Sequence, residues 1–256
     1  MPTYPLIQSG HRLSIFLPGG SVAIPMILGI GLNYAKHAAE QGSKLPERPV
    51  VFAKNIAALT GGFGVIRVPK ICQDGTLSAT GVAVGPEGLQ VDYEGELAIV
   101  IGPSPDPSLH CHNVAEKNAH KFILGYAVAN DVSARWWQKS GSGGQFTRGK
   151  GFDTFCPMSD IAAASDVGDP NALRLVTKVN GEVRQDSTTA DMIFGVYKLV
   201  AELSQGTTLL PGTVILTGTP EGVGMARKPQ VFLKDGDVVE IEIERVGRIC
   251  NRVEFE

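Results

Sequence analysis

The stretch Val91-Asp92-Tyr93-Glu94-Gly95-Glu96-Leu97-Ala98-Ile99-Val100-Ile101 places two glutamates at alternate positions inside an apolar run. In a β-strand, residues two apart point to the same face, so Glu94 and Glu96 are expected to project side by side. The alternative is an antiparallel strand whose solvent-facing side carries both glutamates and whose other side carries the aliphatic residues. This stretch alone is compatible with both arrangements.

A second apolar run, Ala127-Val128-Ala129-Asn130-Asp131-Val132-Ser133, contains a third carboxylate. A lone buried carboxylate is costly without a partner, so Asp131 is expected to join Glu94 and Glu96 from a neighbouring strand. Three converging carboxylates repel one another unless a cation neutralises them. An all-oxygen cluster suits Mg²⁺, Mn²⁺ or Ca²⁺ rather than zinc.

The composition limits the classes of protein to consider. A formal charge of −3 and a pI near 6.0 argue against nucleic acid or an anionic membrane as the main partner. The 256 residues include 31 glycines and 16 prolines. Together they make up a larger share of the chain than the roughly 12% that glycine and proline contribute to an average globular protein, so they predict many turns and a strand-rich fold. The four cysteines are scattered, and neither a signal peptide nor a long apolar run is evident, so we expect a cytoplasmic protein with reduced thiols.

Apolar runs bounded by turn residues predict the secondary structure. Strands are expected over residues 13–17, 27–31, 50–53, 173–179, 213–217 and 238–246, and helices over 34–41 and 191–204. Asn180-Gly181 is typical of a hairpin turn. Residues 72–89 predict an extended hairpin or surface loop, and glycine-rich residues 138–150 predict a mobile loop. The pattern as a whole predicts an α+β, strand-rich body with a few short helices.

Two further motifs carry chemically useful side chains. His37 and Glu40 are three apart in a predicted helix and therefore neighbours, so Glu40 could orient the ring for general base catalysis on water. The alternative is a surface pair without function. Lys150 lies between glycines and could reach a deep anionic site, although it could equally be an exposed loop lysine.

The turn Leu216-Thr217-Gly218-Thr219-Pro220-Glu221-Gly222-Val223-Gly224 offers free backbone N–H groups and two hydroxyls to an anion or a carbonyl oxygen. It lacks the spacing of a nucleotide phosphate loop.

The order of these motifs along the chain resembles the fumarylacetoacetate hydrolase family. The motifs are Tyr34…His37…Glu40, Asp92-Tyr93-Glu94-Gly95-Glu96-Leu97, Asn130-Asp131-Val132-Ser133-Ala134-Arg135, Gly149-Lys150-Gly151-Phe152-Asp153-Thr154-Phe155-Cys156-Pro157, Asn180-Gly181-Glu182-Val183-Arg184-Gln185-Asp186, Asp191-Met192-Ile193-Phe194 and Leu216 to Gly224. The resemblance covers about residues 27–253 and is greatest to short, single-domain members that act on acylpyruvates and related 2-oxo acids.

The resemblance implies a mixed β-sandwich roll over residues 27–256, preceded by a short strand segment over 1–26, and a homodimer. It also implies roles for individual residues. Glu94, Glu96 and Asp131 would hold Mg²⁺ or Mn²⁺, with Ca²⁺ as a non-catalytic substitute. Lys150 would lie beside the metal, and His37 with Glu40 would activate water on a lid. The substrate-binding positions would be Arg135, Gln138, Thr217 and Thr219.

The chain departs from the family pattern in three places. Trp136-Trp137 follows Arg135 where the family commonly has Asp and then an aromatic residue. The stretch from Cys72 to Leu89 is longer than the usual connection, and residues 140–144 are unusually rich in glycine. These differences are expected to affect specificity, at the pocket rim or the dimer contact, and to leave the metal site intact.

The function predicted from the residues and the resemblance is metal-dependent C–C bond hydrolysis of acylpyruvate-like 1,3-diketo acids through a metal-bound enolate. A small 2-oxo or 1,3-diketo acid would be the substrate. Decarboxylation of oxaloacetate or keto–enol isomerisation or hydration at the same site is an alternative. Two others are a biosynthetic enzyme for a larger diketone, motivated by Trp136-Trp137, and a non-catalytic binding protein.

Overall fold

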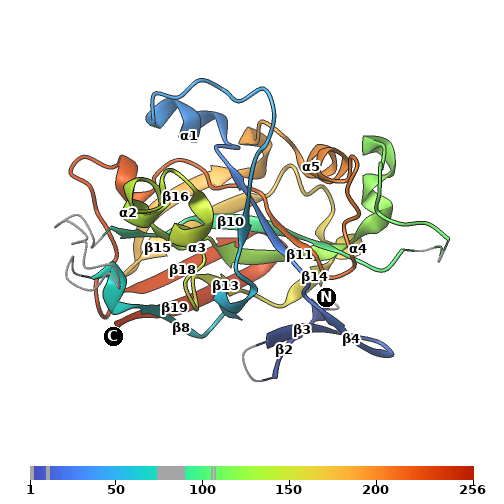
Figure 1. Cartoon of the computed structure of the whole chain (residues 1–256), viewed down its shortest axis with the longest axis horizontal. Coiled ribbons are helices and arrows are strands. Elements are labelled where there is room, and N and C mark those ends of the chain that lie inside the picture. Colours follow the sequence, from blue (N-terminus) through green and yellow to red (C-terminus); the bar gives the residue numbers. More distant parts are fainter. Residues whose placement is uncertain (1–2, 10–11, 74–89, 105, 107) are drawn as a thin grey trace.

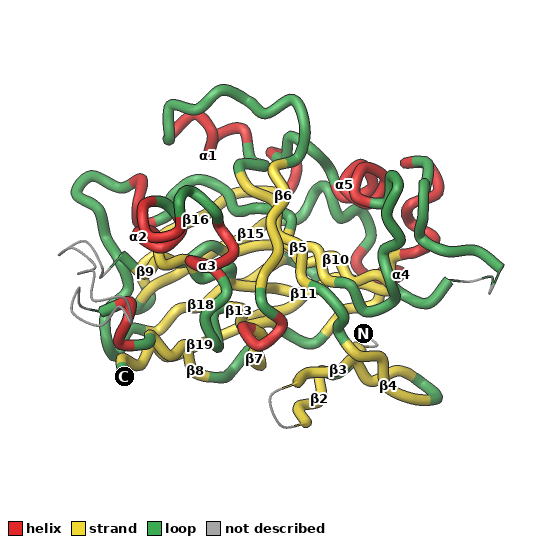
Figure 2. Tube along the Cα trace, viewed as in Figure 1, coloured by secondary structure: helices red, strands yellow, loops and turns green. Residues whose placement is uncertain are grey.

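The computed structural model describes residues 3–9, 12–73, 90–104, 106 and 108–256 (Figure 1). Strands form the body of the molecule, and the short helices lie around its outside (Figure 2). The longest sheet contains β1 (Thr3–Tyr4), β14 (Ile161–Ala163), β11 (Ile123–Asn130), β10 (Gly95–Ile101), β17 (Val214–Leu216), β5 (Ile27–Gly31) and β6 (Val50–Lys54) in that spatial order, with β13 (Cys156–Met158) and β7 (Leu59–Gly61) attached through β11.

The other sheets are smaller. A five-stranded sheet has the order β16 (Glu182–Thr188), β15 (Arg174–Val179), β18 (Val238–Ile243), β19 (Gly247–Phe255) and β8 (Val65–Val68). The N-terminal segment forms a three-stranded sheet of β2 (Leu6–Ser9), β3 (Arg12–Leu17) and β4 (Gly20–Ala23), and β12 (Ser133–Ala134) pairs with β9 (Val91–Asp92).

The helices are short. They are α1 (Ala35–Glu40), α2 (Arg135–Gln138), α3 (Phe146–Lys150), α4 (Ala164–Val167) and α5 (Val196–Leu203), with 3₁₀ turns η1 (Ile56–Ala58), η2 (Lys70–Cys72), η4 (Glu116–Phe122), η5 (Ser140–Ser142), η6 (Thr189–Asp191) and η7 (Gly224–Ala226). No helix in the described part of the chain has the length and apolarity needed to cross a membrane. Parallel and antiparallel pairs both occur, and the prediction of a strand-rich, mixed α+β fold is confirmed.

The pair β10–β11 lies at the centre of the core. Both strands contact the five-stranded sheet, β10 through β15 and β11 through β18 and β19. Every residue of β10 is buried, and so is all of β11 except the half-buried Leu124. This explains their continuous apolar sequences, because a strand covered on both faces has no solvent-facing side. The alternative in which Glu94 and Glu96 line a solvent face is therefore wrong.

The predicted hairpin turn and the predicted helix over 34–41 are confirmed. Asn180 and Gly181 have φ angles of 53° and 78°, the left-handed pair that a two-residue hairpin between β15 and β16 requires. The helix predicted over 191–204 begins later, at Val196. The reason is tertiary: Met192 bridges to Tyr34, and the N–H groups of Ile193 and Phe194 donate to Asn33, so this segment is not free to coil.

Residues 138–150, for which a mobile loop is predicted, contain regular structure. The segment contains η5 and α3, and α3 packs against α2. Gly149 makes this packing possible, because a Cβ there would lie only 2.3 Å from the backbone nitrogen of Gln138. The glycine therefore permits close approach between two backbones. Of the predicted insertion over residues 72–89, residues 74–89 lie outside the described part of the chain.

We predict that Gly149→Ala destabilises the fold by about 1–3 kcal/mol, because the added methyl group must push α2 and α3 apart. Gly61→Ala is the control, since a Cβ at Gly61 meets no atom within 4 Å. The free energy of unfolding from urea titration measures both. Equal losses in the two variants would contradict the close-packing explanation.

Candidate metal centre and active site

Three carboxylates meet where β10 begins and β11 ends. Gly95 is paired with Asn130 in the antiparallel register, so Glu94 and Asp131, the next residues outward, lie next to each other. The N–H of Asp131 donates to the carbonyl oxygen of Glu94 at 2.9 Å, and the side chain of Asn130 accepts from the N–H of Glu94 at 3.0 Å. One oxygen from each of Glu94, Glu96 and Asp131 lies within 4.8 Å of the others. The structure thus brings together the three predicted metal ligands.

Cationic side chains from α3, β6 and α2 surround this cluster, namely Lys150, Lys54 and Arg135. The Nζ of Lys150 donates to Glu94 Oε2 at 2.7 Å, to Asp131 Oδ2 at 2.5 Å and to the hydroxyl of Ser133 at 2.7 Å. Lys54, fully buried at the end of β6, lies with its Nζ 2.5 Å from the other oxygen of Asp131. Lys150 therefore occupies the place beside the cluster that the resemblance implies, and Lys54 is a member that the sequence analysis missed.

Glu96 is the carboxylate that these cations leave uncompensated. Its Oε2 accepts from the N–H of Gly218 at 2.7 Å, and no ion pair involves it among the described residues. Burial, followed by the charges of Asp131 and Glu94, raises the pKa of Glu96 well above its ordinary value. At Glu94 burial acts in the same direction, but Lys150 and Arg135 outweigh it and lower the pKa.

This charge distribution fits a divalent cation. The raised pKa of Glu96 indicates that this buried carboxylate has too little positive charge near it. Three carboxylate oxygens also form the donor set that Mg²⁺ and Mn²⁺ prefer. Glu94, Glu96 and Asp131 are the residues that would hold the ion. This donor set suits Mg²⁺ and Mn²⁺ equally, since both ions accept oxygen ligands.

The predicted dyad forms on the short helix α1. The Nδ1 of His37 lies 2.6 Å from Glu40 Oε1, and the second oxygen of Glu40 accepts from the N–H of Gly222 at 3.0 Å. His37 is 5% exposed, so its ring is held in the protein rather than on the surface. A carboxylate accepts, so in the neutral ring Nδ1 carries the proton and Nε2 presents its lone pair.

Arg135 is fixed from behind by a buried aspartate. Its Nε and Nη2 donate to Asp92 Oδ2 at 2.9 and 2.8 Å, and its Nη1 lies 2.6 Å from Glu94 Oε1 and 3.0 Å from Gln138 Oε1. Asp92 also accepts from the backbone N–H groups of Tyr93, Gly224 and Met225. Asp92 therefore ties Arg135 to the turn after Gly222.

The two predicted threonines are placed differently. Thr219 borders the cavity described below, and its hydroxyl donates to the carbonyl oxygen of Gly95 at 3.0 Å. The hydroxyl of Thr217 donates to the carbonyl oxygen of Leu97 at 2.9 Å, and Thr217 is not among the residues that line this cavity. The structure brings Thr219 to the cavity and keeps Thr217 against β10, directly after the end of β17.

A cavity of about 270 Å³ opens onto this centre. The polar side chains that line it include Glu94, Lys150, His37, Arg135, Gln138, Thr219, Gln41 and Lys139. His37 of the dyad and Glu94 of the carboxylate cluster therefore face the same space, although they are 57 positions apart in the sequence. Trp136 and Trp137 do not line it; the Trp137 indole donates to the carbonyl oxygen of Ile71 and packs on Phe152.

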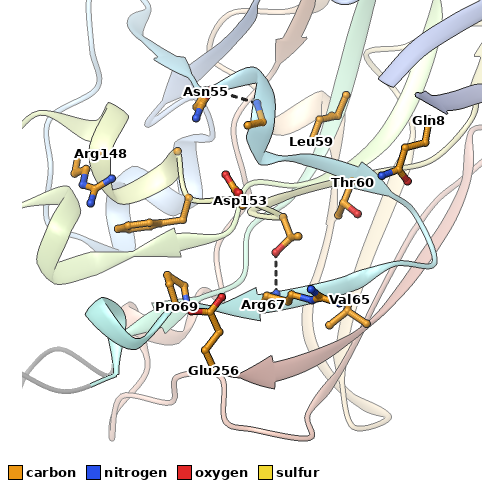
Figure 3. Close-up of a pocket in the computed structure, with 14 residues that line it drawn as sticks. Gln8, Asn55, Leu59, Thr60, Val65, Arg67, Pro69, Arg148, Asp153 and Glu256 are labelled. Carbon is orange, nitrogen blue, oxygen red and sulfur yellow. Dashed lines mark hydrogen bonds between the residues drawn. The ribbon is translucent and has the colours of Figure 1, made fainter. Parts of the chain in front are cut away.

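A larger cavity of about 600 Å³ lies elsewhere, with Arg148 of α3 in its lining (Figure 3). Arg148, Asp153, Arg67 and Glu256 contribute its charged groups. Helix α3 separates the two spaces, because Arg148 borders the larger one whereas Lys150 donates into the carboxylate cluster. Only the smaller cavity contacts the carboxylates, so we assign the active site there.

Lys54, Asp92 and Gln41 are the site residues that the sequence analysis missed. Lys54 could have been found by the argument that found Asp131, because it ends the apolar run Val50-Val51-Phe52-Ala53 as a single charge. Asp92 stands in the same stretch as the two glutamates, but its partners lie 43 and 132 positions away. Gln41 could have been found by the spacing that pairs His37 with Glu40, because it stands four residues after His37 in the predicted helix.

Comparison with known proteins identifies the family. A family model described as the fumarylacetoacetate hydrolase C-terminal region matches residues 26–254. The chain belongs to this family. The resemblance predicted from the motifs is therefore confirmed.

Members of the family that resemble this chain carry different reaction names. Mitochondrial oxaloacetate tautomerase FAHD2A of Bos taurus is 42% identical over 228 residues, which are 89% of this chain and 66% of that protein. The chain thus spans slightly less than two thirds of this relative. A 5-carboxymethyl-2-hydroxymuconate delta-isomerase from Mycobacterium smegmatis is 36% identical with a TM-score of 0.73, covering 99% of this chain and 94% of that one.

The third relative is a fumarylpyruvate hydrolase from Pseudomonas aeruginosa, solved in complex with Mn²⁺ and pyruvate. It is 27% identical with a TM-score of 0.77, covering 98% of this chain and 99% of that one. The family is thus one of enzymes, with tautomerase, isomerase and hydrolase members. Membership alone does not select among these reactions.

We predict that Glu96→Gln weakens Mn²⁺ binding by about 100-fold, the upper end of the loss seen when a residue that supports a metal site is removed. The amide keeps the shape and can still accept from Gly218, but it lacks the charge. Isothermal titration calorimetry of the metal-free protein with MnCl₂ measures the change. Glu202→Gln, at an exposed residue of α5, is the control, and an unchanged affinity in Glu96→Gln would contradict the assignment.

A second prediction concerns Lys54. Lys54→Met should lower the free energy of unfolding of the metal-free protein by about 3–5 kcal/mol, because Asp131 would be left buried with half of its compensation removed. Lys36→Met provides the control, since its ion pair with Glu221 is exposed and worth at most about 1 kcal/mol. Similar losses in both variants, measured by urea titration in EDTA, would show that Lys54 contributes no special compensation.

Proposed function

We propose that the protein is a divalent-metal-dependent enzyme that hydrolyses a C–C bond in acylpyruvate-like 1,3-diketo acids. The observation that carries the proposal is that His37, which is paired with Glu40, and Glu94, which belongs to the carboxylate cluster, border one small cavity. Hydrolysis needs a base for water, whereas decarboxylation does not. The hydrolase relative solved with Mn²⁺ and pyruvate supports the same combination of metal and product class.

The metal, held by Glu94, Glu96 and Asp131, would supply Lewis-acid polarisation of the 2-oxo acid end of the substrate. His37 would accept a proton from water at Nε2 while Glu40 holds Nδ1–H and stabilises the imidazolium. The water oxygen then forms a bond to the distal carbonyl carbon. The C–C bond between that carbon and the pyruvate part breaks, its electron pair stays with the pyruvate carbon, and the proton returned from His37 completes pyruvate.

The hydrogen bonds of Lys150 assign it to orienting the ligands. An ammonium group has three N–H bonds, and Glu94, Asp131 and Ser133 provide three acceptors. We therefore propose that Lys150 holds the cluster rather than donating to a substrate oxygen. Arg135 is likewise committed to Asp92 and Glu94, so Gln138 and Thr219 are the neutral groups among the predicted substrate-binding residues that border the cavity.

A second candidate is keto–enol tautomerisation or decarboxylation of oxaloacetate. The tautomerase name of the Bos taurus relative supports it, together with a contact in this chain: Gln41 lies against the ring nitrogen that hydrolysis would use. The biosynthetic alternative is based on the Trp136-Trp137 pair, which does not line the cavity, and the space of about 270 Å³ suits a small oxo acid rather than a larger diketone.

The homodimer, the cytoplasmic location and the boundary near residue 26 stay predictions.

Product analysis separates the candidates. Acetylpyruvate and oxaloacetate are each incubated with the Mn²⁺-loaded protein, and ¹H NMR follows acetate, pyruvate and the keto and enol forms. Acetate and pyruvate in equal amounts from acetylpyruvate support hydrolysis. Faster keto–enol exchange of oxaloacetate without acetate from acetylpyruvate supports the second candidate instead.

We predict that His37→Ala lowers kcat for acetylpyruvate hydrolysis by about 10²–10⁴-fold, the usual contribution of a positioned base. Mn²⁺ affinity should stay within about twofold, because His37 is not among the three oxygen donors. Steady-state kinetics and calorimetry measure the two quantities. Full hydrolase activity in this variant would exclude the dyad from the reaction.

A further inference from the structure

The lone pair with which His37 would accept a proton from water already accepts a hydrogen bond within the protein. The Nδ1 of His37 faces Glu40 Oε1 at 2.6 Å, so in the neutral ring the proton is on Nδ1 and Nε2 is the accepting nitrogen. The side-chain nitrogen of Gln41 lies 2.7 Å from that Nε2. Since the ring nitrogen is an acceptor, the amide must donate to it. Gln41 follows directly after α1 and lines the same cavity as His37.

We propose that Gln41 is a gate on the base, and that a polar group at the far end of the substrate opens it. The inference rests on the proposed function, since it concerns the same dyad. An imidazole nitrogen has one lone pair in the ring plane, so Nε2 cannot accept from water while it accepts from the amide. Once Nε2 takes a proton it becomes a donor, and the N–H of Gln41 must find another acceptor. Catalysis therefore requires Gln41 to leave.

The surroundings of Gln41 indicate what would draw it away. Lys139 lines the same cavity, and its ammonium donates to the thioether sulfur of Met225 at 3.1 Å. A thioether is a weak acceptor, so a carboxylate or carbonyl oxygen would compete well for Lys139. The same oxygen would accept from Gln41. A substrate that ends in a carboxylate or carbonyl group can thus open the gate, whereas one that ends in a methyl group offers no acceptor.

This assigns Gln41 a role in specificity. Acylpyruvates with a terminal oxygen group should react faster than acetylpyruvate, and the difference should come from the step in which His37 accepts its proton. Gln41→Met tests this, because methionine is similar in length but cannot donate a hydrogen bond. Lys44→Met, three residues along the same segment, is the matched control; Lys44 is exposed.

The kinetic test compares acetylpyruvate with fumarylpyruvate for the Mn²⁺-loaded wild-type, Gln41→Met and Lys44→Met proteins. In Gln41→Met we expect kcat for acetylpyruvate to rise about three- to tenfold, the effect of one neutral hydrogen bond, so that the preference for fumarylpyruvate falls by a similar factor. Lys44→Met should match wild type. A parallel loss on both substrates in Gln41→Met, with their ratio unchanged, would overturn the gate.

A spectroscopic test keeps the gate separate from the proposed function. The ¹⁵N signals of the His37 ring, assigned by their loss in His37→Ala, report whether Nε2 accepts a hydrogen bond. We expect the Nε2 signal to move in Gln41→Met and to stay in place in Lys44→Met. If wild type hydrolyses neither substrate, the proposed function fails, and this signal alone decides the gate: an unchanged Nε2 signal in Gln41→Met overturns it.

Discussion

The structure depends on neutralising buried negative charge at the point where β10 and β11 meet. Three carboxylates lie within 4.8 Å of one another and are at most 6% exposed. Lys54 comes from β6 and Lys150 from α3, so the electrostatic requirement also fixes where these elements lie. Removing one partner of such a set leaves an uncompensated charge in a medium that cannot solvate it. The site and the fold are therefore stabilised by the same contacts.

The sequence predicts the parts of this centre that local pattern controls. The alternation of Glu94 and Glu96 and the isolated charge of Asp131 are visible because each interrupts an apolar run, and apolar runs are the signal of buried strands. The Asn180-Gly181 hairpin is predicted for a similar reason, since its backbone conformation follows from two residues. The order of the motifs along the chain then indicates the family, which no single motif establishes.

The remainder depends on contacts between distant residues. Lys54 meets Asp131 across 77 positions, and Asp92 meets Gly224 across 132. The start of α5 is likewise set by Asn33, whose side chain accepts a hydrogen bond from the N–H of Phe194. Glycine is ambiguous as well: Gly149 looks like a loop residue in the sequence, but it serves the close packing of α3 on α2. Local propensity cannot distinguish these cases because the deciding atoms belong to other elements.

The contrast between the metal centre and α1 bears on how one family contains a tautomerase, an isomerase and a hydrolase. The carboxylates and their cations are buried in the body of the sheet, where a change in one requires changes in several. The His37–Glu40 dyad instead lies on a six-residue helix, and Glu40 reaches the body through one hydrogen bond to Gly222. Polarisation of a 2-oxo acid can then stay constant while the neighbours of His37 vary. Because Nε2 has a single lone pair, whichever group occupies it, Gln41, water or substrate, decides which proton moves.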